Sequence, residues 1–143
     1  MADHRKLRVW QQAQDFVVHL ADALLPSITA RLPGLRNQLL RAAASIPAAI
    51  AEGAAQQSMA QYARYLSIAL GSASETESHL TLAVRLHVVR DGDERLMELE
   101  HIRKMLYRLR EAVVRGANEP RGGSGGQPPL RSSSSSRKAP PTP

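Results

Sequence analysis

Carboxylates and histidines in two predicted helices are the side chains with the most obvious chemical potential. Glu98 and His101 form a Glu-x-x-His motif, the pattern that helical bundles use to hold carboxylate-bridged metal ions. Asp15, His19 and Asp22 share one face of an earlier helix. A carboxylate-bridged centre needs a second Glu-x-x-His motif, which the sequence lacks, and no cysteine is present to supply a thiolate. We therefore predict no metal site.

Motifs of catalysis and of cofactor binding are also missing from the sequence. It contains no glycine-rich phosphate loop, no nucleophile elbow and no convincing Ser/His/Asp arrangement. We predict that the protein is not an enzyme and binds no cofactor. A metal-dependent enzyme is a third and lesser hypothesis, which metal analysis of protein purified without chelator would test.

Basic side chains concentrate in the last predicted helix. Residues 101–116 carry them against a single carboxylate, Glu111. The basic residues are Arg103, Lys104, Arg108, Arg110 and Arg115. Lys104, Arg108 and Arg115 fall on one outward face of a helical wheel, which suits the tracking of phosphates, so we predict backbone binding of nucleic acid without sequence readout. The alternative is structural, because a helix dipole favours cations in its last turn and basic stems cover apolar edges.

The net charge of +6 gives this prediction only modest support. Residues 1–116 contain 15 Lys and Arg against 12 Asp and Glu, so half of the excess lies in residues 117–143. That last segment is rich in Gly, Ser and Pro and has too little apolar surface to offset the entropy of ordering, so we predict a disordered basic tail. With one Phe, one Trp and three Tyr in the chain, platforms for base stacking are scarce.

Four helical patterns and no strand pattern precede the tail. The first carries an apolar stripe formed by Trp10, Ala13, Val17, Leu20 and Leu24. The second runs from about residue 35 to 56, the third from Ser58 to about residue 89, and the fourth ends with Gly116 as its C-terminal cap. Because the connections are short, neighbouring helices should be antiparallel. We predict an all-α, antiparallel up-down four-helix bundle over residues 1–116.

Hydropathy along the chain bears on where the protein resides. No apolar run is long enough to span a membrane, and no charged start followed by an apolar segment marks a signal peptide. We expect a cytoplasmic protein without a membrane partner.

The third predicted helix is apolar on two sides. One side carries Tyr62, Leu66, Leu70, Ala73, Leu80 and Val84. The side nearly opposite carries Ile68, Leu82, Leu86 and Val89. A helix that is apolar on two sides is covered on two sides, and in a four-helix domain the second cover is most simply another subunit, so we predict a homo-oligomer. The alternative is a locally apolar surface on a monomer. Gly71 in this helix is predicted to be a close packing point.

Polar side chains in the second predicted helix form a stripe on one face. Gln38, Arg41, Ser45 and Glu52 lie opposite its apolar positions, whereas Glu77 falls within the first apolar side of the third helix. We predict that Glu77 forms a structural ion pair, with Arg41 as a candidate partner, because an isolated buried carboxylate is prohibitively costly; a functional carboxylate is the alternative. The stripe is predicted to meet a subunit contact or a bound phosphate, with an ordinary solvated face as the alternative.

A proline lies inside this second helix. Pro47 removes one backbone hydrogen bond and crowds the preceding turn, which costs about 3 kcal/mol or more in a helix interior. We predict that a bend at Pro47 lets the helix follow its neighbours in the bundle and turns the polar stripe toward a subunit contact.

Five ordered motifs between residues 5 and 115 carry a family resemblance. They are Leu7-Arg8-Val9-Trp10-Gln11, Gln38-Leu39-Leu40-Arg41-Ala42-Ala43, Ser45-Ile46-Pro47-Ala48-Ala49-Ile50-Ala51-Glu52-Gly53, Tyr65-Leu66-Ser67-Ile68-Ala69-Leu70-Gly71-Ser72-Ala73 and Glu75-x-Glu77. The chain resembles the four-helix-bundle family linked to intervening sequences of bacterial 23S ribosomal RNA genes, sometimes called S23-type proteins. It departs from that pattern at Ala49, where the family usually has Asn, and at Gln56-Gln57, in a loop that is often basic.

The resemblance implies an assembly and a set of partners. The family fold is similar to that of accessory proteins of diversity-generating retroelements, which form pentameric barrels and are implicated in binding nucleic acid and a reverse transcriptase. By resemblance we expect a homopentamer or another ring, with RNA, DNA or a reverse transcriptase as partners. Our first hypothesis is a non-enzymatic, oligomeric bundle of this kind. The second is a structural or protein-interaction scaffold with no role in nucleic-acid binding.

Overall fold

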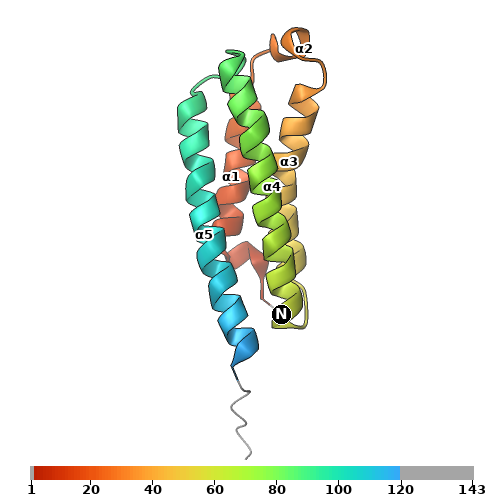
Figure 1. Cartoon of the computed structure of the whole chain (residues 1–143), viewed down its shortest axis with the longest axis vertical. Coiled ribbons are helices and arrows are strands. Elements are labelled where there is room, and N and C mark those ends of the chain that lie inside the picture. Colours follow the sequence, from red (N-terminus) through yellow and green to blue (C-terminus); the bar gives the residue numbers. More distant parts are fainter. Residues whose placement is uncertain (1, 120–143) are drawn as a thin grey trace, which may run out of the picture.

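Four long helices form an antiparallel bundle in the computed structural model of the protein, which describes residues 2–119 (Figure 1). The long helices are α1 (Arg8–Ala23), α3 (Leu35–Ala54), α4 (Met59–Arg85) and α5 (Gly92–Asn118). Two short helices, η1 (His4–Lys6) and α2 (Ile28–Arg31), flank α1. No strand occurs within residues 2–119, so the all-α up-down bundle is confirmed.

The core is a single cluster to which all four long helices contribute. Its largest fully buried side chains include Phe16, Leu20, Leu39, Ile46, Ile50, Leu66, Leu80, Leu99, Ile102 and Leu106. Each such side chain contributes about 1.5–3 kcal/mol when it is removed from water. The most extensive packing joins α3 to α4 and α4 to α5, whereas α1 makes smaller contacts with α3 and α5. Helix α4 therefore packs between α3 and α5, and a seam at the surface follows each of these two contacts.

The apolar stripe of α1 is rotated relative to the sequence prediction. Its buried residues are Val9, Ala13, Phe16, Leu20 and Ala23. Trp10 and Val17, which the prediction placed on the stripe, are only partly buried and pack at the edge of the core. Both sets have helical spacing, so the pattern alone identified a broad apolar arc without its centre. Phe16, which is fully buried, lies on the buried face in place of its neighbour Val17.

Helix α3 continues through its proline without interruption. Pro47 lies inside Leu35–Ala54 and is buried, so its ring packs in the interior while its missing amide costs one hydrogen bond. Gly34, with φ of 87°, reverses the chain just before the helix, a left-handed conformation that favours glycine. The Ser45 hydroxyl donates to the Ala42 carbonyl over 2.6 Å, close to the proline. The bend expected at Pro47 stays a prediction.

The predicted cap of α4 is confirmed, but the glycine at which α3 and α4 pack closely is not the predicted one. The Ser58 side chain accepts a hydrogen bond from the Gln61 amide over 3.1 Å and caps α4, as its sequence signature indicated. The close-packing glycine is Gly53, because a Cβ there would lie 2.9 Å from Tyr65 Cβ. The prediction for Gly71 is wrong, since a Cβ at that position would meet no atom within 4 Å.

Helix α5 is longer than predicted at its C-terminal end. It begins at Gly92, after Asp91 adopts a left-handed φ of 51°, and ends at Asn118. Gly116 is therefore an interior residue of the helix, and the prediction that it forms the cap is wrong. The helix runs two residues past the predicted domain boundary at residue 116. The segment 120–143, which holds most of the predicted tail, lies outside the described residues. No helix within residues 2–119 is both long enough and apolar enough to cross a membrane.

Candidate functional site

Three of the five predicted basic residues form an exposed line on α5. Lys104, Arg108 and Arg115 are exposed, and none of them makes an ion pair within residues 2–119. They face away from the core residues Leu106 and Val113 on the same helix. We call Lys104, Arg108 and Arg115 the basic face. Its charges are free to meet an external anion, which is the arrangement that phosphate binding requires.

The other two basic residues hold α5 against α4. Arg103 Nη2 lies 2.5 Å from Glu77 Oε2 and also donates to the Ala73 carbonyl over 3.4 Å. Arg110 Nε donates to Ser67 Oγ over 2.7 Å. These bonds use part of the donor capacity of Arg103 and Arg110. The predicted set of five therefore divides into three free cations and two that join helices.

Glu77 forms an ion pair, as predicted, but its partner is Arg103 and not the candidate Arg41. The Glu77 side chain is 46% exposed, because it lies at the edge of α4 that faces α5. The buried polar residue of α4 is instead Thr76, whose hydroxyl donates to the Ser72 carbonyl over 2.7 Å. A one-residue rotation, about 100° on a helix, separates the two positions. It moves the carboxylate away from α3 and toward α5.

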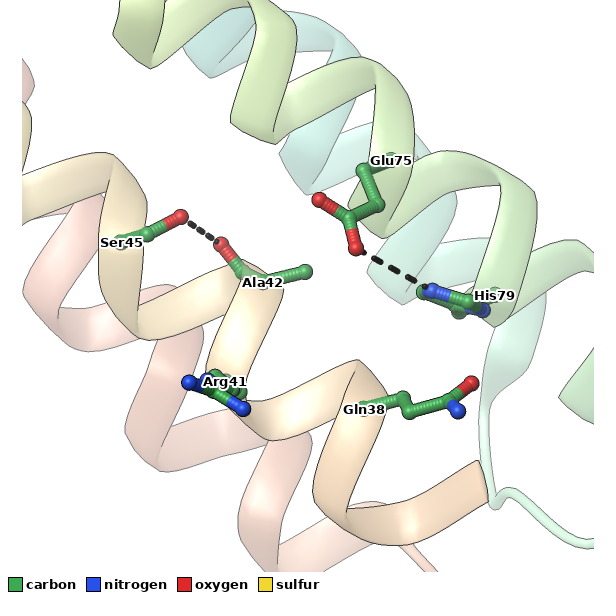
Figure 2. A pocket seen from close by; sticks show the side chains of 6 residues that line it. All are labelled: Gln38, Arg41, Ala42, Ser45, Glu75 and His79. Carbon is green, nitrogen blue, oxygen red and sulfur yellow. Dashed lines mark hydrogen bonds and ion pairs between the residues drawn. The ribbon is translucent and has the colours of Figure 1, made fainter. Parts of the chain in front are cut away.

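A groove of about 470 Å³ lies between α3 and α4 and contains part of the predicted polar stripe (Figure 2). The residues that line it are Gln38, Arg41, Ala42 and Ser45 of α3 and Glu75 and His79 of α4. Glu75 Oε1 lies 3.5 Å from His79 Nε2, whereas Arg41 is exposed and makes no ion pair within residues 2–119. The stripe thus faces solvent in the isolated chain. Its Arg41 guanidinium is available to a further partner.

Neither Glu52, the last residue of the predicted stripe, nor Glu77 of α4 lines this groove. Glu52 is exposed on α3 but does not line it, and Glu77 lies on the other side of α4. Ala49, which lies between Ser45 and Glu52 in the sequence, is only 5% exposed. It therefore belongs to the core side of α3 and does not interrupt an exposed stripe.

Only two of the four residues predicted for the second apolar side of α4 are exposed. Ile68 and Leu82 are 47% and 39% exposed, in agreement with an unpartnered face. Leu86 and Val89 are partly buried and pack against the core, so their assignment to an outer face is wrong. They follow the end of α4, where the chain turns back over the bundle and its side chains no longer keep helical positions.

Two of the five candidate metal ligands of the sequence, His19 and Glu98, form a polar cluster with Arg95 between α1 and α5. His19 Nδ1 lies 2.8 Å from Glu98 Oε1, and Arg95 Nε lies 3.2 Å from Glu98 Oε2. His101 is exposed and takes no part in these pairs. Among the described residues, no three His, Cys, Asp or Glu side chains converge in a way that could hold a metal ion. The cluster therefore links α1 to α5, two helices whose contact with each other is less extensive than the packing of α5 against α4.

Sequence reasoning missed one residue beside the basic face. Tyr107 follows Lys104 by three positions, and the residue is 53% exposed. The other four aromatic residues of the chain, Trp10, Phe16, Tyr62 and Tyr65, are buried or partly buried. A count of aromatic residues could not reveal this, although the helical wheel already placed Tyr107 away from the apolar stripe.

Comparison with known proteins identifies a family. Residues 5–108 match the family model described as "23S rRNA-intervening sequence protein". The match begins within η1, spans the four helices α1 to α4 and most of α5, and includes two residues of the basic face, Lys104 and Arg108. None of the curated proteins matches the chain.

Proposed function

The chain belongs to the family of 23S rRNA-intervening sequence proteins, and on this premise we propose that it is a non-enzymatic, homo-oligomeric bundle that binds the backbone of nucleic acid. It acts as an accessory protein, either on RNA or DNA directly or together with a nucleic-acid enzyme such as a reverse transcriptase. The observation that carries the proposal is the basic face: three exposed cations on one line of α5 without ion pairs within residues 2–119. We propose that the protein resides in the cytoplasm.

The dimensions of the basic face suit a phosphate backbone. Lys104 and Arg115 are separated by roughly 16 Å along the helix axis, from a rise of 1.5 Å per residue. A strand of duplex places one phosphate about every 3.4 Å along its axis, so the face spans several phosphates. Long, exposed Lys and Arg side chains adapt to such a charge array without reading bases. Backbone binding is therefore the chemistry that this surface favours.

The proposed assembly rests on the outer side of α4. Ile68 and Leu82 are large apolar side chains exposed on one helix, and Leu82 lines a shallow hollow together with Ser78 and Arg85. A contact between copies of the chain would bury these residues, and a closed ring such as a pentamer satisfies every copy equally. The same exposed residues support the alternative function, a scaffold that binds proteins and no nucleic acid.

A charge-reversal experiment with a matched control tests the proposal. The variant Lys104→Glu/Arg108→Glu/Arg115→Glu should lose most of its affinity for RNA and DNA, because attraction at three phosphate contacts becomes repulsion. The control Arg31→Glu/Arg36→Glu/Arg64→Glu changes the same charge at three exposed residues of other helices. Equal affinity of the two variants would overturn the assignment of the basic face. Absence of any nucleic-acid affinity in the unmodified chain would favour the scaffold.

A further inference from the structure

We propose that Tyr107 is a stacking platform that makes the basic face selective for single-stranded nucleic acid over a duplex. The inference rests on the proposed function and adds the class of nucleic acid that the site recognises. It depends on three properties of one side chain: its exposure, its lack of a structural role and its position among cations.

The ring of Tyr107 contributes little to the fold. The residue is 53% exposed, and it is not among the partly buried apolar residues that pack against the core, although its helix neighbours Met105, Leu109 and Val114 are. It makes no ring–ring contact with another aromatic side chain of the described residues. Its hydroxyl makes no hydrogen bond with another side chain or backbone group of residues 2–119. An aromatic face is therefore open to an external partner.

Cations surround this ring on both sides. On a helix with 3.6 residues per turn, Lys104, Arg103 and Arg110 all lie within about 60° of Tyr107. Arg103 and Arg110 are fixed by Glu77 and by Ser67 of α4, one turn before and one turn after the ring. The ring thus lies between the basic face on one side and the contacts that join α5 to α4 on the other. A strand whose phosphates follow the basic face would bring a base over the ring.

Stacking of this kind distinguishes nucleic acids by their strandedness. In a duplex each base is already stacked between its neighbours, so a ring on a convex helix surface cannot reach a base face. In a single strand the bases can splay outward, and every base has an aromatic face, so stacking on tyrosine is tolerant of sequence. RNA loops and single-stranded DNA share this property. Glu111 shares the line of the basic face, between Arg108 and Arg115, so the backbone is expected to approach the ring most closely beside Lys104 and Arg108.

The test compares full-length variants on three probes: a short oligouridylate, an oligothymidylate and an RNA duplex of the same length. Tyr107→Ala should weaken binding of both single strands by about 5- to 150-fold, the usual effect of losing one stacked base. It should leave duplex affinity and the salt dependence unchanged, because no phosphate contact is removed. Tyr107→Phe should bind like the unmodified chain. Met97→Ala, which truncates a 72% exposed side chain of the same helix, is the matched control.

Two results would overturn the inference. Single-strand affinity of Tyr107→Ala that equals that of the control, while the charge variant of the basic face still loses binding, would reject stacking and leave the proposed function standing. An equal loss on single strands and duplex, together with a lower oligomer mass in light scattering, would make Tyr107 a subunit contact. A basic-face variant that binds like the unmodified chain would reject the proposed function itself.

Discussion

Basic side chains of α5 divide between contact with α4 and exposure to solvent according to their direction. Arg103 and Arg110 turn toward α4 and bond to Glu77 and Ser67, whereas Lys104 turns outward and has no ion pair within residues 2–119. Position on the helix decides this division, because these residues share the same charge and nearly the same place in the chain. Stability measurements should therefore separate residues that a charge count treats alike.

Replacement of Arg103 tests the structural half of this division. Arg103→Ala should lower the free energy of unfolding by about 1 kcal/mol, because it removes a partly exposed ion pair and the packing of the arginine stem. Lys104→Ala at the adjacent, exposed position should change stability by less than about 0.5 kcal/mol. Urea unfolding followed by circular dichroism measures both. A larger loss for Lys104→Ala than for Arg103→Ala would contradict the account.

Tyr62 carries the buried hydroxyl that should respond to pH. The residue is 8% exposed and its hydroxyl has no hydrogen-bond partner within residues 2–119, although a small cavity of about 100 Å³ adjoins it. Burial raises the pKa of Tyr62 above its usual value of about 10. The folded chain then holds this proton at pH values where the unfolded chain releases it. Stability is therefore intact below about pH 10 and is lost as the pH rises through the folded pKa.

The variant Tyr62→Phe isolates this effect. At neutral pH it should be as stable as the unmodified chain or more stable by up to about 1 kcal/mol, because an unpaired buried hydroxyl is removed. Above pH 10 its stability should fall less steeply than that of the unmodified chain. Thermal unfolding at pH 7 and at pH 10.5 provides the comparison. Identical pH dependence of the two proteins would show that the hydroxyl is not desolvated.

Two glycines in neighbouring helices differ in how closely the other helix packs against them. Gly53 of α3 lies against Tyr65 and Tyr62 of α4, whereas Gly71 of α4 is exposed to open space. Gly53→Ala should destabilise the bundle, because its Cβ would lie 2.9 Å from Tyr65 Cβ in the most extensive helix contact. Gly71→Ala should stabilise it by about 0.5–1 kcal/mol through helix propensity alone. Opposite signs in denaturant unfolding are expected, and equal signs would contradict this packing.

The sequence predicted helices better than it predicted their rotation. Segment 35–54 and the cap at Ser58 follow from local rules, since proline, glycine and capping residues act within one turn. The stripe of α1 was misplaced because Trp10 and Phe16 are both large and apolar, and only the assembled core selects between them. Gly116 was misread as a cap because glycine tolerates helical and left-handed backbone alike. Such choices depend on tertiary contacts.

The candidate site was predictable to a similar degree. The outward direction of Lys104, Arg108 and Arg115 followed from helical spacing, because one face of α5 is occupied by the core. The partner of Glu77 did not follow, because it depends on the rotation of α4 against two neighbours. Tyr107 was overlooked because composition records how many aromatic rings exist and not which of them remain exposed.

The exposed apolar residues on the outer side of α4 bear on whether copies of the whole molecule associate. We expect the chain to be a homo-oligomer whose contacts include Ile68 and Leu82, since both are large, apolar and exposed in the isolated chain. The double variant Ile68→Ser/Leu82→Ser should lower the mass measured by light scattering toward that of a monomer and keep the helical circular dichroism spectrum. Val18→Ser, at a 58% exposed residue of α1, is the control. A monomeric mass for the unmodified chain would refute the assembly.

The most direct test of nucleic-acid binding is the salt dependence of affinity for single-stranded RNA. Because each phosphate contact releases counterions, the logarithm of the binding constant should fall with the logarithm of salt concentration at a slope of about −0.7 per contact. Replacing Lys104, Arg108 and Arg115 by Gln should therefore make the slope shallower by about 2, with a proportionate loss of affinity at low salt. An unchanged slope would show that the exposed cations of α5 do not meet phosphates and would contradict the account.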